Sequence, residues 1–314
     1  MKNPAIKLLL TLAIVSFVFH SCKKDDKKDD QLDSQVQQFN ADSQNYKGES
    51  DQADSDINNA LGEIPAFGRF TTTLSSPLCG VTIDSSQIAQ KILFFNFDGI
   101  TPCFSPSRTR DGQIKVQLTS GTYWSDVNSI LTITYNNFKV TRLSDNKSIQ
   151  FNGVKTLQNV NGHNWIGFLT GTATHKYKEK ALGINVTFDN GSTAVWNSAR
   201  TTEWSFDSAP AVDRIVFTAN GDTTINGVAA IDSWGVNRFG QAFTTYYNAP
   251  WVSNTYCGLW RPNSGQLTHL LNNASYILTL GVDQGGNPTP YQCAYGFKVQ
   301  WNSSAGTIVR VFSY

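Results

Sequence analysis

Two runs of alternating hydrophobic and polar residues lie close together in the stretch from Arg108 to Val140. Their apolar positions are Ile114, Val116 and Leu118 in the first run and Leu131, Ile133 and Tyr135 in the second. A period of two is typical of a strand with one buried and one wet face. Asp111-Gly112 predicts a tight turn in front of the first run, and the polar segment Ser120 to Ser129 connects the two runs. We therefore predict an antiparallel pair of strands.

Asn-Gly dipeptides, which favour the two-residue turns of β-hairpins, recur through the rest of the chain. They stand at Asn152-Gly153, Asn161-Gly162, Asn190-Gly191, Asn220-Gly221 and Asn226-Gly227. Further alternating runs flank several of them, so the chain is predicted to be all-β, an antiparallel meander of roughly a dozen or more strands. A sheet of that size must curl, close or split in two, which predicts a large curved sheet or a sandwich.

The all-β domain is predicted to cover residues 63–314. A short echo in its sequence, Phe151-Asn152-Gly153-Val154 and later Ile225-Asn226-Gly227-Val228, suggests two similar halves. Residues 22–62 are predicted to be a polar linker, because Lys23 to Glu63 holds five Lys against nine Asp and two Glu, a net charge of −6. Within the linker, the apolar spacing in Asp51 to Leu61 predicts a short helix that docks on the domain.

Residues 1–21 have the pattern of a lipoprotein signal peptide. A basic start is followed by an apolar run, Leu8 to Phe19, that is too short to span a membrane. Cys22 closes the segment, as the lipidated cysteine of a bacterial lipobox does. We expect acylation of Cys22 to anchor the protein to a membrane. An ordinary secretory signal with an incidental cysteine is the alternative.

The four residues after Cys22 are Lys23, Lys24, Asp25 and Asp26. Basic and then acidic residues directly behind a lipidated cysteine are similar to a surface-export signal. The expected location is therefore the outer membrane, with the protein exposed at the cell surface. A solvated tether is the simpler interpretation, and the two are compatible.

The overall charge gives no reason to expect nucleic acid as a partner, because charged residues make up 16% of the chain and the net charge is +1. The remaining cysteines are Cys79, Cys103, Cys257 and Cys293. An even number in an exported chain, with no C-x-x-C spacing, favours disulfides over a metal site. The simplest pairing joins Cys79 to Cys103 and Cys257 to Cys293, although three connectivities are open.

Several segments together resemble a group of Bacteroidetes surface lipoproteins. They are Cys22 to Asp26, Arg108 to Ile114, the following TSGTYW and LTITYNNFKV segments, and Cys293 to Gly296. The resemblance covers most of the mature chain and implies a location at the cell surface. Because that group has no established activity, it implies no catalytic residue and no cofactor.

Tryptophan is the most suggestive candidate for a binding function. Aromatic rings in loops, surrounded by amide and carboxylate side chains, suit the recognition of sugar faces. Trp124, Trp234 and Trp251 are the candidates for ligand binding, and packing in the core is the alternative for each. We predict a non-enzymatic protein that binds a glycan, an envelope component or a partner protein, or that has a structural role in the envelope.

A polysaccharide-acting hydrolase is the alternative function. Such an enzyme needs two carboxylates that face each other across a cleft. Glu203, beside Trp204, with Asp189 or Asp232 as its partner, is the candidate pair. The sequence has no nucleophile elbow and no H-E-x-x-H metal motif, so no catalytic or metal-binding residue is assigned.

Overall fold

The structure is a computed structural model. It describes the backbone of residues 26–33 and all of residues 34–68, 78–103, 107–162, 168, 174–207, 214–258, 261–272, 274–289, 293–303 and 306–314. The chain divides into two units, one that ends at Gln44 and one that runs from Asn45 to Tyr314. In the first unit the described residues, 26–44, belong to the long helix α2, Asp26–Glu63. The second unit contains the last turns of α2 and the whole sheet.

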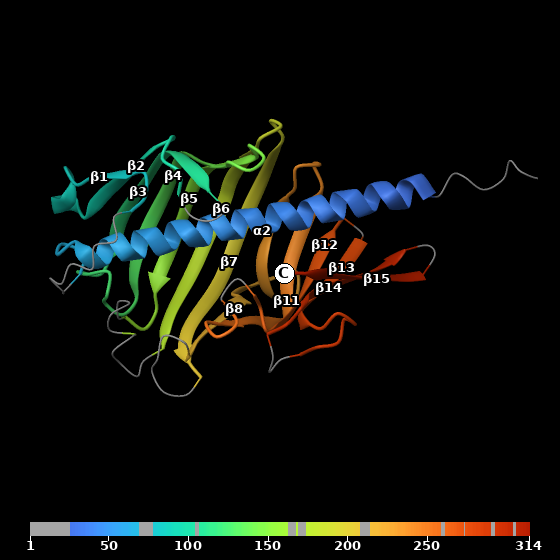
Figure 1. Ribbon diagram of the computed structural model, residues 1–314. Coiled ribbons are helices and arrows are strands. Elements are labelled where there is room, and N and C mark those ends of the chain that lie inside the picture. The colour runs from blue at the N-terminus through green and yellow to red at the C-terminus, as the bar shows by residue number, and fades with distance from the viewer. Residues whose placement is uncertain are drawn as a thin grey trace, which may run out of the picture. The chain divides into compact units, whose positions relative to one another are not determined.

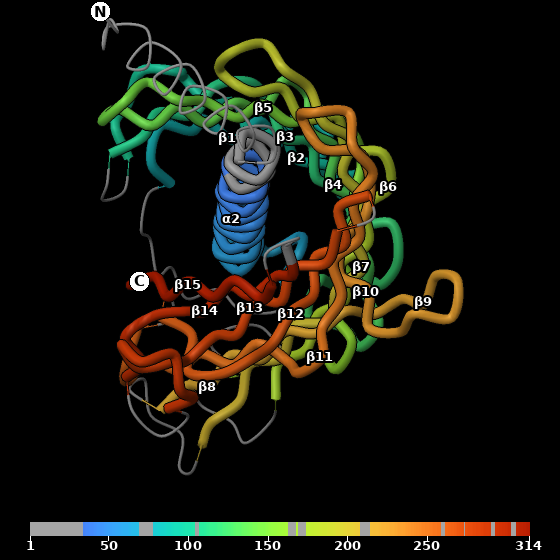
Figure 2. The backbone as a smooth tube through the Cα atoms, turned by 90° about the vertical axis from the view of Figure 1, so that its right-hand side faces the viewer, coloured from blue at the N-terminus to red at the C-terminus, as the bar shows by residue number. Residues whose placement is uncertain are grey.

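The second unit is built on one antiparallel sheet of 15 strands, which confirms the predicted all-β class (Figure 1). The strands are β1 Val81–Asp84, β2 Ile92–Asp98, β3 Arg108–Ser120, β4 Ser129–Arg142, β5 Ser148–Asn159, β6 His175–Phe188, β7 Thr193–Phe206, β8 Ile215–Gly221, β9 Thr223–Ile225, β10 Val228–Val236, β11 Ala242–Asn254, β12 Ser264–Leu271, β13 Ala274–Val282, β14 Gly296–Ser303 and β15 Gly306–Ser313. A short 3-10 helix, η2, Ile88–Gln90, precedes β2. The sheet curls around the Asn45–Glu63 segment of α2 (Figure 2).

The strand pair predicted from the alternating pattern is β3 and β4. Ile114 lies opposite Tyr135, Val116 opposite Ile133, and Leu118 opposite Leu131. All six side chains are buried. The predicted turn at Asp111-Gly112 is wrong, because β3 already begins at Arg108 and the register shifts between Asp111 and Gln113. The dipeptide forms a β-bulge in which Gly112 has a φ of +86°.

Only some of the Asn-Gly dipeptides turn the chain. Asn190-Gly191 lies in the turn from β6 to β7, and Asn226-Gly227 lies in the turn from β9 to β10. Asn152-Gly153 lies within β5 instead, at a shift of register against β6. A side chain at Gly153 would stand 2.9 Å from Ile184 Cδ1, so this glycine permits close packing inside the sheet. The two segments that suggested similar halves therefore lie in different local structures of one continuous sheet.

Strand β8 departs from the simple meander in a way that matters for the site. It pairs with the second half of β7, from Arg200 to Phe206, and with the end of β11, from Trp251 to Asn254. Strand β10 occupies the corresponding place beside the first halves of the same two strands. This insertion brings aromatic residues of β7, β8 and β11 next to one another.

Both predicted disulfides are confirmed. Cys79 is bonded to Cys103 and Cys257 to Cys293, with Cα atoms 5.8 and 5.2 Å apart. The first disulfide ties the segment before β1 to the segment before β3. The second ties the loop after β11 to the segment before β14.

The predicted helix at Asp51 to Leu61 is confirmed as part of the longer α2. Ala53, Ile57, Ala60 and Leu61 are buried, as the apolar spacing requires. The sequence pattern underestimated the length of the helix, because the turns before Asp51 dock through polar and aromatic residues. Ser50 is 3% exposed, and Tyr46 stacks on Trp196 with ring centroids 4.8 Å apart. Cys22, Lys23, Lys24 and Asp25 lie outside the described residues, and Asp26 begins the helix.

Candidate functional site: a cavity between the helix and the sheet

A cavity of about 570 Å³ lies between the end of α2 and the concave face of the sheet. The helix contributes residues from Gly48 to Gly62, and the sheet contributes residues from β5, β6, β7, β8 and β11. Ligand pockets in proteins usually measure about 300–1,000 Å³. The cavity is therefore large enough for a small organic ligand or a short oligosaccharide.

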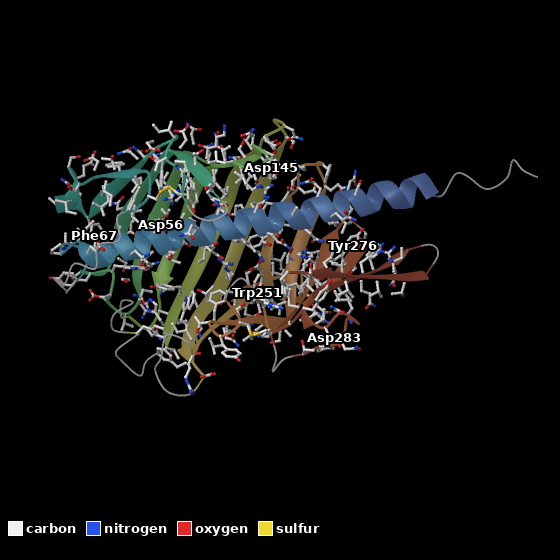
Figure 3. All side chains as sticks on the ribbon, in the orientation of Figure 1. Asp56, Phe67, Asp145, Trp251, Tyr276 and Asp283 are labelled. Carbon is white, nitrogen blue, oxygen red and sulfur yellow. A yellow bond between two sulfur atoms is a disulfide. The ribbon has the colours of Figure 1, made fainter. Side chains whose placement is uncertain are left out.

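The wall that the sheet and its loops contribute is rich in aromatic side chains. Its aromatic members are Phe67, Trp124, His175, Tyr177, Trp204, Phe217 and Trp251. Trp204 of β7 lies opposite Phe217 of β8, and their ring centroids are 4.8 Å apart. Trp251 stands on β11 next to β8, and its Nε1 donates a hydrogen bond to Ser253 Oγ at 2.7 Å (Figure 3). The insertion of β8 thus creates one side of this aromatic wall.

The wall that the helix contributes is polar. Its members are Gly48, Asp51, Gln52, Asp54, Ser55, Asn58, Asn59, Leu61 and Gly62. Apart from Leu61 and the glycines, each residue offers an amide, a hydroxyl or a carboxylate. These residues recur every three to four positions, which places them on one side of an α-helix. The cavity therefore has an aromatic wall and a polar wall.

Asn58 connects the two walls at one end of the cavity. Its Oδ1 accepts a hydrogen bond from Trp124 Nε1 at 2.6 Å and another from the Tyr177 hydroxyl at 3.2 Å. The Trp124 and Tyr177 rings stack with centroids 5.8 Å apart, and His175 bonds to the same hydroxyl. This end of the cavity is held rigidly by a side chain of the helix.

A cluster of ionic side chains, most of them buried, borders the other part of the cavity. Lys155 Nζ of β5 lies 2.7 Å from Asp54 Oδ1 and 3.7 Å from Glu179 Oε2. Arg200 of β7 pairs with Asp51, and its Nη2 lies 3.3 Å from Glu179 Oε2. In this ionic cluster three carboxylates share two cations. If all five groups are ionised, the cluster carries a charge of −1.

Two carboxyl groups of the ionic cluster differ widely in pKa. Burial alone raises the pKa of Glu179, but Lys155 and Arg200 outweigh burial and hold this pKa at about 2. Burial also raises the pKa of Asp54; Lys155 opposes this effect, while the Glu179 carboxylate adds to it, and the result is a pKa of about 7. A proton on Asp54 makes the cluster neutral. Asp54 is therefore the carboxyl group whose charge depends on pH near neutrality.

One carboxylate oxygen from each of Asp51, Asp54 and Glu179 lies within 4.8 Å of the other two, a spacing that a metal ion can bridge. However, Lys155 and Arg200 already bring positive charge to these oxygens. A metal ion would have to compete with an ammonium and a guanidinium that are both held in the structure. We therefore describe the group as an ion-pair network.

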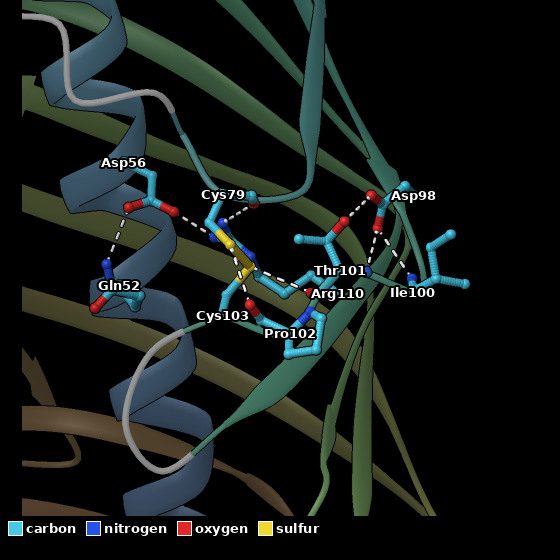
Figure 4. Close-up of a disulfide and its surroundings, with 9 residues drawn as sticks. All are labelled: Gln52, Asp56, Cys79, Asp98, Ile100, Thr101, Pro102, Cys103 and Arg110. Carbon is cyan, nitrogen blue, oxygen red and sulfur yellow. Dashed lines mark hydrogen bonds and ion pairs between the residues drawn. A yellow bond between two sulfur atoms is a disulfide. The ribbon is translucent and has the colours of Figure 1, made fainter.

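Other ion pairs fasten the same helix to the sheet. Lys47 Nζ lies 2.6 Å from Asp232 Oδ2, and Arg108 pairs with Glu49. Arg110 pairs with Asp56 and also donates to the Cys79 carbonyl at 2.8 Å, beside the first disulfide (Figure 4). These pairs lie outside the cavity lining.

The structure brings two of the three predicted tryptophans to the cavity. Trp124 is 4% exposed and packs at the end of the cavity where it bonds to Asn58, and Trp251 is half-buried in the aromatic wall. Trp234 is half-buried in β10 and is not among the lining residues. Glu203 does not line the cavity either: it is partly exposed, and its Oε2 lies 3.4 Å from Lys176 Nζ. Its neighbour Trp204, on the other face of the strand, does line it.

The sequence patterns missed the ionic cluster. Lys155 and Arg200 both occupy positions in phase with the buried residues of their strands, such as Leu157 and Trp196. A basic residue at an inward-facing position requires an acidic partner on the element that covers it. That signal pointed to an acidic covering helix, whereas the acidic segment was interpreted as a solvated linker.

Comparisons with known proteins give no relative: no family model, curated protein or solved structure matches the chain. Among the described residues, no helix combines the length and apolar character that crossing a membrane requires.

Proposed function

We propose that this chain is a surface-anchored binding lipoprotein whose cavity between α2 and the sheet holds a saccharide. The observation that carries the proposal is the pairing of an aromatic wall with a polar wall across one cavity. A sugar ring has apolar faces of C–H groups and a rim of hydroxyl groups. It can stack on rings such as Trp204 while its hydroxyls bond to side chains such as Gln52 and Asn59.

The proposal favours binding over hydrolysis. Glu203, the candidate carboxylate of the alternative hydrolase function, does not line the cavity. Glu179 does line it, but its Oε1 accepts a hydrogen bond from Ser198 at 2.7 Å and its Oε2 faces Lys155 and Arg200. A carboxylate held in this way is suited to positioning the helix. A hydrolase remains the alternative, and release of reducing sugar that is lost in Glu203→Gln would establish it.

Substitutions in the aromatic wall test the binding proposal. Purified protein would be applied to insoluble chitin, cellulose and peptidoglycan, and the retained fraction measured. Trp204→Ala and Trp251→Ala should weaken retention on at least one of these polymers about three- to tenfold, because each removes a stacking surface. Melting temperatures of the same variants would show whether the fold persists, and Trp204→Phe provides a variant that keeps an aromatic ring.

Trp234→Ala is the matched control, since Trp234 is a half-buried tryptophan outside the cavity lining. It should leave retention unchanged. Equal retention of wild type and both cavity variants, or no retention of the wild type on any polymer, would contradict saccharide binding in this cavity.

The anchor is a separate part of the proposal and rests on the sequence around Cys22. Cys22→Ser should abolish metabolic labelling with palmitate, because it removes the thiol that would be acylated. Replacing Lys24, Asp25 and Asp26 with alanine should keep the label but reduce protease accessibility on intact cells. Labelling that survives Cys22→Ser would rule out the lipid anchor at this position.

A further inference from the structure

We propose that two copies of this chain join edge to edge through strand β15, so that their sheets continue into one another. This inference goes beyond the proposed function and does not depend on it. Three observations carry it. The outer edge of β15 is free, this edge lacks the features that prevent strand pairing, and in one register the strand is complementary to a second copy of itself.

The outer edge of β15 offers unpaired backbone groups. Among the strands that the structure describes, β15 pairs only with β14, and the register between the two is unbroken. In an antiparallel pair, residues that exchange hydrogen bonds with the partner strand alternate with residues whose N–H and C=O groups point away from it. Tyr314 N donates to Tyr295 O at 3.2 Å, which fixes this alternation. The groups that point away from β14 therefore belong to Thr307, Val309, Val311 and Ser313.

β15 has few of the features that protect an edge strand. Natural sheets protect their edges with short strands, prolines, bulges or charged side chains. β1, at the opposite end of the sheet, has only four residues, whereas β15 has eight and contains no proline, no acidic residue and no bulge (Figure 1). Two of its apolar side chains are well exposed, Val309 by 44% and Phe312 by 37%. A long, apolar and exposed edge of this kind favours pairing with another strand.

The one charged residue of β15 covers a small part of this edge. Arg310 Nη1 donates a hydrogen bond to Val309 O at 3.1 Å. Both residues are exposed, so water can replace this bond at little cost. A backbone N–H group of an incoming strand can therefore take its place at the Val309 carbonyl.

A second copy of β15 supplies a matching set of donors and acceptors. Two identical strands can pair antiparallel about a two-fold axis, the commonest symmetry of homodimers. The outward groups of both strands meet when the axis passes through residue 309, 310 or 311, near the middle of the strand. An axis at Arg310 would place two guanidinium groups directly opposite each other, which is unfavourable. An axis at Val311 would leave Gly306 and Thr307 unpaired.

An axis at Val309 uses the strand most completely. It pairs residues 306–312 of one copy with the same residues of the other. The two Val309 side chains then lie opposite each other, and Thr307 lies opposite Val311. Cross-strand pairs of β-branched residues stabilise a sheet. Pairing in this register also buries the exposed Val309 side chains and avoids a direct contact between the two Arg310 residues.

Edge-to-edge pairing leaves the cavity between α2 and the sheet unchanged. No residue of β15 is among the residues that line it. A dimer therefore carries two copies of the cavity. Binding to a polymer with repeated ligand groups would become bivalent and tighter than binding by one copy.

The oligomeric state in solution tests the proposal. The mature chain with Cys22→Ser, which carries no acyl group, would be studied by sedimentation velocity between about 1 and 100 µM. It should form a dimer within this range. Val309→Lys should weaken dimerisation at least about tenfold, because two ammonium groups would then face each other across the axis. Melting temperatures would show that the variant remains folded.

Val236→Lys is the matched control. Val236 is 41% exposed, but its strand β10 is already paired with β7 and β11 on its two sides. This variant should dimerise like the parent chain. A parent chain that stays monomeric throughout, or a Val309→Lys variant that dimerises as tightly as the parent, would overturn the proposal.

A cysteine at the two-fold axis tests the register. Cα atoms of a hydrogen-bonded antiparallel pair lie about 5.5 Å apart, a distance that a disulfide can span. Under mild oxidation Val309→Cys should therefore form a covalent dimer much faster than Val236→Cys. Equal rates for the two variants would overturn pairing about Val309. These measurements use no saccharide, so their outcome is independent of the proposed function.

Discussion

The helix that covers the sheet is attached to it in two different ways within a few residues. At Asp56 one carboxylate meets one guanidinium, Arg110, whose side chain is 3% exposed. At Asp51 and Asp54, five and two residues earlier, three carboxylates share the two cations Lys155 and Arg200. The first arrangement is neutral and lies outside the cavity lining. The second carries an excess charge and borders the cavity.

This difference separates a position that fastens the helix to the sheet from positions that border the cavity. A buried one-to-one pair is strongly destabilised when one partner is lost, because a charge is left without compensation. In a cluster with one carboxylate too many, the loss of one negative charge restores balance. The same substitution should therefore cost much stability at one position of the helix and little at the other.

The largest effect is expected for Asp56→Asn. It removes the carboxylate that pairs with the buried guanidinium of Arg110 and should lower the free energy of unfolding by about 3–5 kcal/mol in urea denaturation. Asp145→Asn is the matched control, since Asp145 pairs with Arg142 where both side chains are 37% exposed. That control should lose much less stability, because solvent screens an exposed ion pair. Equal losses in the two variants would mean that burial of the Asp56 pair has no energetic consequence.

Removal of the first disulfide should have a somewhat smaller effect. Cys79 and Cys103 are separated by 24 residues. In the chain-entropy model the loss of a loop of this size costs about 3 kcal/mol. The double variant Cys79→Ser, Cys103→Ser should also weaken the hydrogen bond that Arg110 donates to the backbone carbonyl of residue 79. A double variant as stable as the oxidised wild type would show that the Arg110 site does not depend on the cross-link.

A pH series should show the raised pKa of Asp54, which results mainly from burial and to a smaller extent from the Glu179 carboxylate. The pKa of Asp54 is raised from 3.8 to about 7 in the folded protein, so the folded state holds a proton that the unfolded state has released. Stability contributed by this group therefore falls as the pH rises from about 4 to 7 and is constant above that range. Glu179, with a lowered pKa, has the opposite effect between pH 2 and 4.5.

Melting temperatures of wild type and Asp54→Asn, measured between pH 4 and 8, isolate the Asp54 contribution, because Glu179 is present in both. The wild type should lose stability relative to the variant as the pH rises towards 7. A constant difference across the range would show that Asp54 titrates at its ordinary pKa.

The smallest effect is expected for Asp54→Asn at pH 7. It leaves two carboxylates for two cations, and the new amide oxygen can still accept a bond from Lys155. The free energy of unfolding should change by less than about 1 kcal/mol, in contrast to the same substitution two residues further along at Asp56. A loss at Asp54 as large as the loss at Asp56 would contradict the distinction between the two arrangements.

Much of the architecture followed from local patterns. The alternation in β3 and β4 predicted their pairing and buried faces, and the spacing of the cysteines predicted both disulfides. Local patterns failed where similar dipeptides adopt different structures. Asp111-Gly112 and Asn190-Gly191 are similar in sequence, yet one forms a bulge and the other a turn, because the partner strand decides which conformation is used.

The cavity was only partly accessible from the sequence. Trp124 and Trp251 were candidates because they are aromatic residues beside polar residues in the sequence. No local sequence pattern shows that β8 is inserted between β7 and β11. The ionic cluster joins Asp51 to Arg200 across 149 positions of the chain. Such a contact depends on the order of strands in the whole sheet, which alternating patterns do not encode.

The position of α2 in the chain has a consequence for the order of folding. Its docking surface is assembled from strands as distant as β10, which carries Asp232 as the partner of Lys47. The helix therefore leaves the ribosome first and can settle only after the middle of the sheet has formed, since contacts at long sequence separation close late. In pulse-labelling hydrogen exchange during refolding, we expect the amides of residues 46–63 to gain protection after those of β3 and β4. Simultaneous protection would mean that the helix is part of the folding nucleus.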